Sequence, residues 1–477
     1  MVNQQTQEQT DPTTVNRGPL MMVLISGAFV AILNQTLLGT ALPPIMEDLN
    51  LDENTVQWLQ SIFMLVNGIM IPITAFLIER FTTRGLFLSA MSFFAIGTLI
   101  CALSPNFSFL MVGRVAQAAG AGIMLPLMQT ILFLVYPIEK RGTAMGMFGL
   151  VIAFAPAIGP SLSGYLVDQF PWRSLFYIVL PIAIIDIIVA YFILKNVTKQ
   201  TFPKVDVISI ILSTLGFGGL LYGFSSAGGT GWGSTPVIAS LIVGAITLIL
   251  FINRQLKLDH PILEFRIFKY TIFTLTTALG MVVFIAMIGG AVILPLLMQN
   301  MLGFSALESG LALLPGAILM GLMNPITGRL FDKFGARWLA IIGLTIVVIT
   351  TFLFTVISIE TTFAYIATVN AVRMLGVAMV MMPVTTAGLN QLPSNLMPHG
   401  TAMNNTMRQI AGAVGTALLV TVMTNNAIPD EGVSGAIHGV NVSFIVAGVA
   451  AIIGLILAFF VKNSRPGVDD IKSITTK

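Results

Sequence analysis

Long apolar runs alternate with short polar stretches along nearly the whole chain. A helix that crosses a bilayer needs about 20 mostly apolar residues, and fourteen runs approach or exceed that length. They lie at 19–46, 57–78, 86–104, 107–135, 142–167, 173–195, 206–226, 235–253, 271–298, 306–331, 337–358, 361–392, 403–424 and 440–462. The pattern predicts an all-α polytopic membrane protein with fourteen transmembrane helices.

The composition supports this prediction and excludes an ordinary soluble domain. Hydrophobic residues make up 56% of the chain and charged residues 9%, whereas soluble proteins carry about 25% charged residues. The net charge of +3 does not indicate a nucleic-acid partner. Cys101 is the only cysteine, which excludes a disulfide framework and a cysteine-based metal site. We therefore expect the lipid bilayer as the surroundings, and neither a metal nor an organic cofactor.

Lysines and arginines mark one side of the predicted membrane. The loops that follow the even-numbered spans are rich in them, whereas the loops on the other side hold Arg173 alone. Short loops rich in Lys and Arg face the cytosol. This alternation predicts that both termini are cytosolic, with polar tails at 1–18 and 464–477.

Three landmarks occur twice in the same order. They are the acids Glu79 and Asp332, the intramembrane arginines Arg114 and Arg373, and the sequence GTAM that begins at Gly142 and at Gly400. The offsets are about 253, 259 and 258 residues, and such internal repeats are common in transporters. The spacing predicts two pseudo-symmetric six-helix bundles, at 19–200 and 263–463, with two extra linker helices at 201–262.

The segment 328–337, GRLFDKFGAR, resembles the cytosolic signature loop of the major facilitator superfamily. The first-half copy, AFLIERFTTR at 75–84, departs from that pattern, so the gating role that the motif implies is better assigned to Asp332 than to Glu79. The resemblance implies a gate, to which we assign Glu79, Arg80, Asp332 and Lys333. An acid of this kind can contact the N-terminus of a neighbouring helix. The alternative is that these charges only set the topology.

Two further segments extend the resemblance. LMVGRVAQAAGAG at 110–122 is similar to the fourth-helix motif of the superfamily, and APAIGPSLSG at 155–164 resembles the fifth-helix motif found mainly in its exporters. The second motif adds Gly159, Pro160 and Gly164 to the gating residues, because Gly-Pro and small residues allow bending and close packing. Ordinary helix packing is the alternative.

Fourteen spans narrow the resemblance to the drug:proton antiporter subgroup, over residues 19–462. HPILEFRIF at 260–268 and NNTMRQIAGAVGTAL at 404–418 are also similar to that subgroup. The resemblance implies proton-coupled efflux of amphipathic drugs by alternating access in a bacterial plasma membrane. It also implies that the protein is monomeric and that protons are the coupling ion.

The first helix lacks the carboxylate expected in this subgroup. Asn34 stands where an aspartate is usual, followed by Gln35. Asp186 is the only acid deep in a predicted span, and Ala183 and Ala190 lie on its helix face, which suggests that it points toward protein. We expect Asp186 to carry the coupling proton and Arg114 to modulate it. The alternative is a structural aspartate bonded to a neighbouring side chain.

The substrate class is weakly marked. Candidate cavity residues are either polar or adaptable apolar side chains, and methionine re-packs readily. They are Asn34, Gln35, Met124, Gln129, Phe284, Met298, Gln299, Asn370 and Arg373. The alternatives are ordinary packing for these residues, and for the chain an exporter of an endogenous lipid, peptide or nucleotide, or a non-transporting sensor. The sequence contains no Walker A, HExxH or GxSxG motif, so we expect no enzyme activity.

Overall fold

The computed structural model describes residues 16–461. Fourteen helical spans in this range are long and apolar enough to cross a membrane, which confirms the predicted fold class. Residues 1–15 and 462–477 lie outside the described part, so most of the two predicted tails is not placed.

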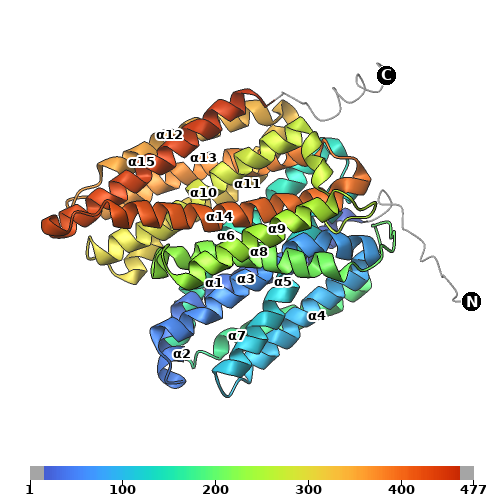
Figure 1. Cartoon of the computed structure of the whole chain (residues 1–477), viewed down its shortest axis with the longest axis horizontal. Coiled ribbons are helices and arrows are strands. Elements are labelled where there is room, and N and C mark those ends of the chain that lie inside the picture. The colour runs from blue at the N-terminus through green and yellow to red at the C-terminus, as the bar shows by residue number, and fades with distance from the viewer. Residues whose placement is uncertain (1–15, 462–477) are drawn as a thin grey trace, which may run out of the picture.

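The first six spans form one group of packed helices, drawn in blue and cyan in Figure 1. Polar N-caps begin several of them: the side chain of Asp52 accepts a hydrogen bond before α3, Thr82 before α4, and Asn106 before α5. The helices are α1 (Arg17–Leu37), the short α2 (Leu42–Asp48), α3 (Glu53–Arg80), α4 (Thr83–Ala102), α5 (Phe107–Val135), α6 (Arg141–Gln169) and α7 (Ser174–Ile193).

The last six spans form the second group, yellow to red in Figure 1. Ser305 and Glu308 form a capping box at the start of the second of these helices. The group comprises α10 (Thr271–Asn300), α11 (Ala306–Phe334), α12 (Ala336–Leu353), α13 (Phe363–Leu389), α14 (Met397–Asn425) and α15 (Gly432–Phe459).

Helices α8 (Val207–Thr230) and α9 (Thr235–Gln255) pair with each other between the two groups. Figure 1 shows them in green across the centre of the view. Helix α8 packs against both α3 and α14, so it contacts both groups. Their assignment as a linker between two bundles stays a prediction.

Several predicted spans have different bounds from those expected, and the fourteenth begins at Gly432 instead of residue 440. The first is interrupted by a 3-10 turn at Gly39–Ala41, after which Pro43 and Pro44 lie at the start of α2. The thirteenth begins at Met397 instead of residue 403, with Pro398 in its first turn. Proline is compatible with the first turn because the N–H groups there have no partner within the helix. Residues 397–402 therefore belong to α14.

Close glycine contacts occur at corresponding helix pairs of the two groups. A Cβ added to Gly113 of α5 would lie 2.8 Å from the carbonyl oxygen of Gly97 in α4. In the second group, a Cβ on Gly376 of α13 would lie 2.7 Å from the carbonyl oxygen of Gly343 in α12. Small residues allow such close helix packing in membranes. These matching contacts agree with the internal repeat inferred from the sequence.

Candidate functional site

Asp332 connects the two groups at the predicted cytosolic side. It lies in the last turn of α11 and accepts three hydrogen bonds from the start of α6. The backbone N–H groups of Gly142 and Thr143 donate at 2.8 Å each, and the Thr143 hydroxyl donates at 2.6 Å. A carboxylate is favourable at a helix N-terminus because the first N–H groups there have no partner within the helix. Asp332 thus makes the contact expected from its motif, while its role as a gate stays a prediction.

Glycine lets α6 and α11 approach closely enough for this contact. A Cβ on Gly328 would meet the carbonyl oxygen of Gly142, so any larger residue there would push the two helices apart. A second hydrogen bond joins the groups nearby, from Arg141 Nη1 to Asn390 Oδ1 at 3.0 Å. The ends of the two groups are therefore joined at several points on this side.

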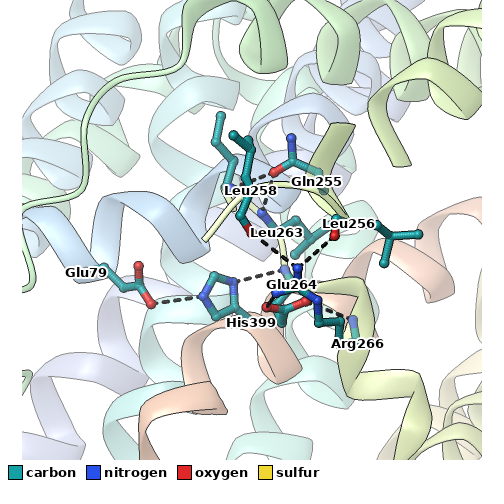
Figure 2. A network of polar contacts seen from close by, with 9 residues as sticks. Glu79, Gln255, Leu256, Leu258, Leu263, Glu264, Arg266 and His399 are labelled. Atoms are coloured by element: carbon teal, nitrogen blue, oxygen red, sulfur yellow. Dashed lines mark hydrogen bonds and ion pairs between the residues drawn. The ribbon is translucent and has the colours of Figure 1, made fainter. Parts of the chain in front are cut away.

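Glu79, the first-half counterpart of Asp332, also reaches the other group. Its Oε1 atom lies 2.9 Å from Nε2 of His399, in the first turn of α14 (Figure 2). The Nδ1 atom of His399 accepts a hydrogen bond from the backbone N–H of Glu264, at 3.3 Å. Since Nδ1 is the acceptor, the neutral ring carries its proton on Nε2 and donates it to Glu79.

The segment before α10 is itself held in place by polar contacts (Figure 2). Gln255 accepts from the backbone N–H of Ile262 at 2.7 Å, and Arg266 forms an ion pair with Glu264 at 3.3 Å. These bonds position the Glu264 N–H that donates to His399. The first group and the segment before α10 thus meet at one histidine of α14.

His399 was not among the residues predicted from the sequence, because it lies outside the predicted thirteenth span. A usable signal was present: His399 precedes the second GTAM sequence as Arg141 precedes the first. A cavity of about 660 Å³ lies beside the histidine, and its lining includes Glu79, Lys199, His260 and Glu264. This polar lining contrasts with a chain that is only 9% charged.

The other predicted gating residues make local contacts. Arg80 donates to the carbonyl oxygen of Pro203 at 2.8 Å, in the segment before α8. Lys333 is exposed, with its ammonium 5.1 Å from the ring centre of Phe334. Neither makes a hydrogen bond or ion pair to the opposite group among the described residues, so these contacts give the gating prediction no direct support.

In the fifth-helix motif, Gly159 and Pro160 lie within α6. Gly159 is buried and packs against Thr36 of α1, whereas Pro160 is exposed. A Cβ on Gly164 would meet no heavy atom within 4 Å. Close packing at this motif therefore falls on Gly159.

Asp186 lies on the buried face of α7, and 4% of its surface is exposed. This confirms that it points toward protein. The Ser26 hydroxyl of α1 donates a hydrogen bond to its Oδ1, while Oδ2 is buried without a partner. No hydrogen bond or ion pair within residues 16–461 joins Asp186 to Arg114.

Arg114 instead belongs to a chain of polar contacts that includes Asn34. Its Nε donates to the carbonyl oxygen of Leu59 and its Nη1 to Gln117 Oε1, both at 3.0 Å. The guanidinium also lies over the ring of Phe63, 4.3 Å from its centre. Gln117 Nε2 lies 3.5 Å from Asn34 Oδ1. Helix α1 therefore contacts Asp186 through Ser26, and it contacts Gln117, the partner of Arg114, through Asn34.

The predicted cavity residues are dispersed in the structure. Met298 is fully buried and belongs to the apolar core of the second group, whereas Gln299 is exposed near the end of α10. Met298 therefore packs in this core, and its role in a cavity stays a prediction. The remaining candidates are half-buried, for Gln35 and Phe284, or buried, for Asn34, Met124, Gln129, Asn370 and Arg373.

Only one of these candidates joins the two groups through a hydrogen bond. Asn405 of α14 donates to Gln129 Oε1 of α5 at 2.6 Å, next to a hydroxyl pair between Thr130 and Thr401 at 2.7 Å. Arg373 lies 5.5 Å from the ring centre of Phe354, within the second group.

Comparison with known proteins agrees with this architecture. A family model described as Major Facilitator Superfamily matches residues 24–416. The MFS-type transporter YcnB of Bacillus subtilis is 57% identical, over 94% of this chain and 96% of the relative. The lincomycin resistance protein LmrB of the same organism is 43% identical over 94% and 96% of the two chains. The multidrug export protein EmrB of Escherichia coli is 30% identical over 85% and 80%.

A solved structure shows the same fold. The human organic anion transporter MFSD10 superimposes with a TM-score of 0.67 at 14% identity, over 92% of this chain and 99% of that one.

Proposed function

Because the chain belongs to the major facilitator superfamily, a family of transporters and not of enzymes, we propose that it exports amphipathic drugs or antibiotics in exchange for protons. Two bacterial relatives bear names for lincomycin resistance and multidrug export. The chain is a multi-pass membrane protein, and we propose that it works as a monomer in the bacterial plasma membrane with both termini in the cytosol.

The observation that carries the proposal is the set of hydrogen bonds between the two groups at one side of the membrane. Asp332 binds the start of α6, and Glu79 binds His399 at the start of α14. The bonds lie at the ends of helices that belong to opposite groups. In an alternating-access cycle these bonds hold the predicted cytosolic side closed and break when that side opens.

Proton coupling requires a group that gains and loses a proton as access changes. Asp186 is the buried carboxylate at membrane depth among the described residues, and such residues are commonly functional. Its bond to Ser26 ties its charge state to α1. Asn34 lies eight residues further along α1, about 12 Å away, and contacts the Arg114 chain through Gln117. In this proposal, protonation of Asp186 alters its bond to α1, and Arg114 responds through the same helix.

Proteoliposomes loaded with a pH-sensitive dye test the coupling. Lincomycin and a panel of amphipathic dyes are added to the wild-type protein and to Asp186→Asn. We expect substrate-evoked proton flux in the wild type and none in the variant. Asp168→Asn, an exposed aspartate at the end of α6, is the matched control and should retain the flux.

Two results would count against the proposal. Full flux in Asp186→Asn, with the flux also kept in Asp168→Asn, would move the coupling group elsewhere, with Glu308 next to test. No flux in the wild type for any compound would remove the evidence for drug:proton exchange.

An exporter of an endogenous lipid, peptide or nucleotide remains the second candidate. YcnB, at 57% identity, bears a name that assigns no substrate. A substrate panel that compares drugs with cell extracts would separate the two candidates. The non-transporting sensor is not retained, because the chain belongs to a transporter family.

A further inference from the structure

Helix α14 carries a row of polar side chains into the membrane. The row starts at Thr401, passes Asn405, and reaches Arg408, whose surface is only 4% exposed. Arg408 lies eleven residues after the start of α14, about 16 Å along the axis at 1.5 Å per residue. With a hydrocarbon core of about 30 Å, this depth is near the middle of the bilayer.

The guanidinium of Arg408 has almost no partner. Its one hydrogen bond runs from Nη2 to Asn405 Oδ1, at the long distance of 3.5 Å, and its Nε atom is buried without a partner. Among residues 16–461, no ion pair joins it to a carboxylate. Arg114, which is also buried within a span, has two bonds at 3.0 Å and an aromatic ring against its face. A buried charge without such compensation is costly and usually functional.

The neighbouring orphan atoms are also hydrogen-bond donors. Asn404, one turn before Arg408 on the same helix, has its Nδ2 atom buried without a partner. Gln129 is held against Asn405 through its oxygen, which leaves its Nε2 atom unpaired. Exchanging the nitrogen and oxygen of an amide cannot change the character of Arg408, because a guanidinium only donates. The excess of donors suits an anion and disfavours a cation.

The charges at membrane depth point the same way. The buried charged side chains of the described spans include Arg114, Arg373 and Arg408, but only one deep carboxylate, Asp186. Ser26 donates to only one oxygen of Asp186, and Asn34 leaves the first helix neutral at its polar position. The deep carboxylate of the described spans therefore lies within the first group, whereas Arg408 lies next to a contact between the two groups.

We propose that Arg408, with Asn404 and Gln129, binds the anionic group of an amphipathic substrate, such as a carboxylate or sulfonate. This inference rests on the proposed export function and specifies its substrate class. Arg408 supplies the charge, and the two amides supply further N–H donors.

The test uses a fluorescent amphipathic carboxylate and its neutral methyl ester, which share one skeleton. Binding to the full-length protein in lipid nanodiscs is measured by fluorescence anisotropy. A hydrogen-bonded charge pair contributes enough to change affinity about tenfold or more. We therefore expect the wild type to bind the acid at least about tenfold more tightly than the ester, and Arg408→Gln to reduce that ratio to about one.

Further variants separate recognition from folding. Arg408→Lys keeps the charge and should retain part of the preference for the acid. Asn404→Asp places a carboxylate one turn from Arg408, so it should compete with the ligand and abolish the preference while raising the thermal midpoint. Arg329→Gln removes an exposed arginine from α11 and should leave the acid-to-ester ratio unchanged.

The inference is overturned if the wild type shows no preference for the acid, if neither probe binds, or if Arg408→Gln keeps the wild-type ratio. Proton-coupled transport of the ester without a preference for the acid would contradict this inference but would still support the proposed function. Preferential binding of the acid through Arg408 without any coupled transport would contradict the proposed function and support this inference.

Discussion

The contact between Asp332 and α6 provides a direct test of the closed state. Asp332→Asn keeps the shape of the side chain but replaces one oxygen with an NH₂ donor. In the closed state one oxygen accepts from Gly142 and the other accepts two bonds from Thr143. The new amide nitrogen must face at least one N–H donor, so one or two of the three bonds are lost.

The magnitude follows from those bonds. A hydrogen bond to a charged group contributes about 1.5–3 kcal/mol net, and the helix N-terminus adds about 0.3–1 kcal/mol. Because Asp332 is only half-buried, we take about 2 kcal/mol for the total loss. That value corresponds to a shift of roughly thirtyfold toward the state open on the predicted cytosolic side.

Spin labels at Lys140 and Asn395 report this shift. Both positions are exposed, they belong to opposite groups, and the single native cysteine, Cys101, is buried. Pulsed electron spin measurements should show a larger fraction of long distances in Asp332→Asn than in the wild type. Glu360→Gln, an exposed acid between α12 and α13, is the control and should not change the distribution. An unchanged distribution in Asp332→Asn would refute the assignment of closure energy to this contact.

Three further predictions concern other parts of the structure. His399→Gln keeps a donor toward Glu79 and should retain more transport than His399→Leu; equal loss in both variants would contradict the hydrogen-bonding role. Gly376→Ala places a methyl group against the backbone of α12 and should destabilise the protein by about 1–3 kcal/mol, seen as a lower melting temperature in detergent. Asp206 forms a hydrogen-bonded ion pair with Arg254, which lowers the pKa of Asp206 from 3.8 to about 2. The carboxylate therefore stabilises the fold above about pH 4, and this contribution is lost as the pH falls toward 2. The stability difference between wild type and Asp206→Asn should vanish over that range, and a constant difference would contradict the assignment.

Much of the architecture was predictable because the membrane imposes simple rules. Every spanning segment must satisfy its backbone internally and be apolar for about 20 residues, so the fourteen spans are visible in the chain. The repeat was visible for a similar reason, since Asp332 and Glu79 occupy the same helix end in the two halves. Span ends were less predictable, because residues 397–402 are too polar to count as a span.

The residues that meet across the two groups could not be derived from the chain. His399 looked like a loop residue until the structure placed it between Glu79 and the Glu264 N–H. Arg408 was part of a motif, but nothing in the sequence showed that its guanidinium lacks a carboxylate partner. Hydropathy and charge depend on local composition, so the sequence by itself determined the number of spans and the fold class. Pairings between side chains hundreds of residues apart depend on how the helices pack, so only the tertiary structure decided which buried polar groups are satisfied and which have no partner among the described residues.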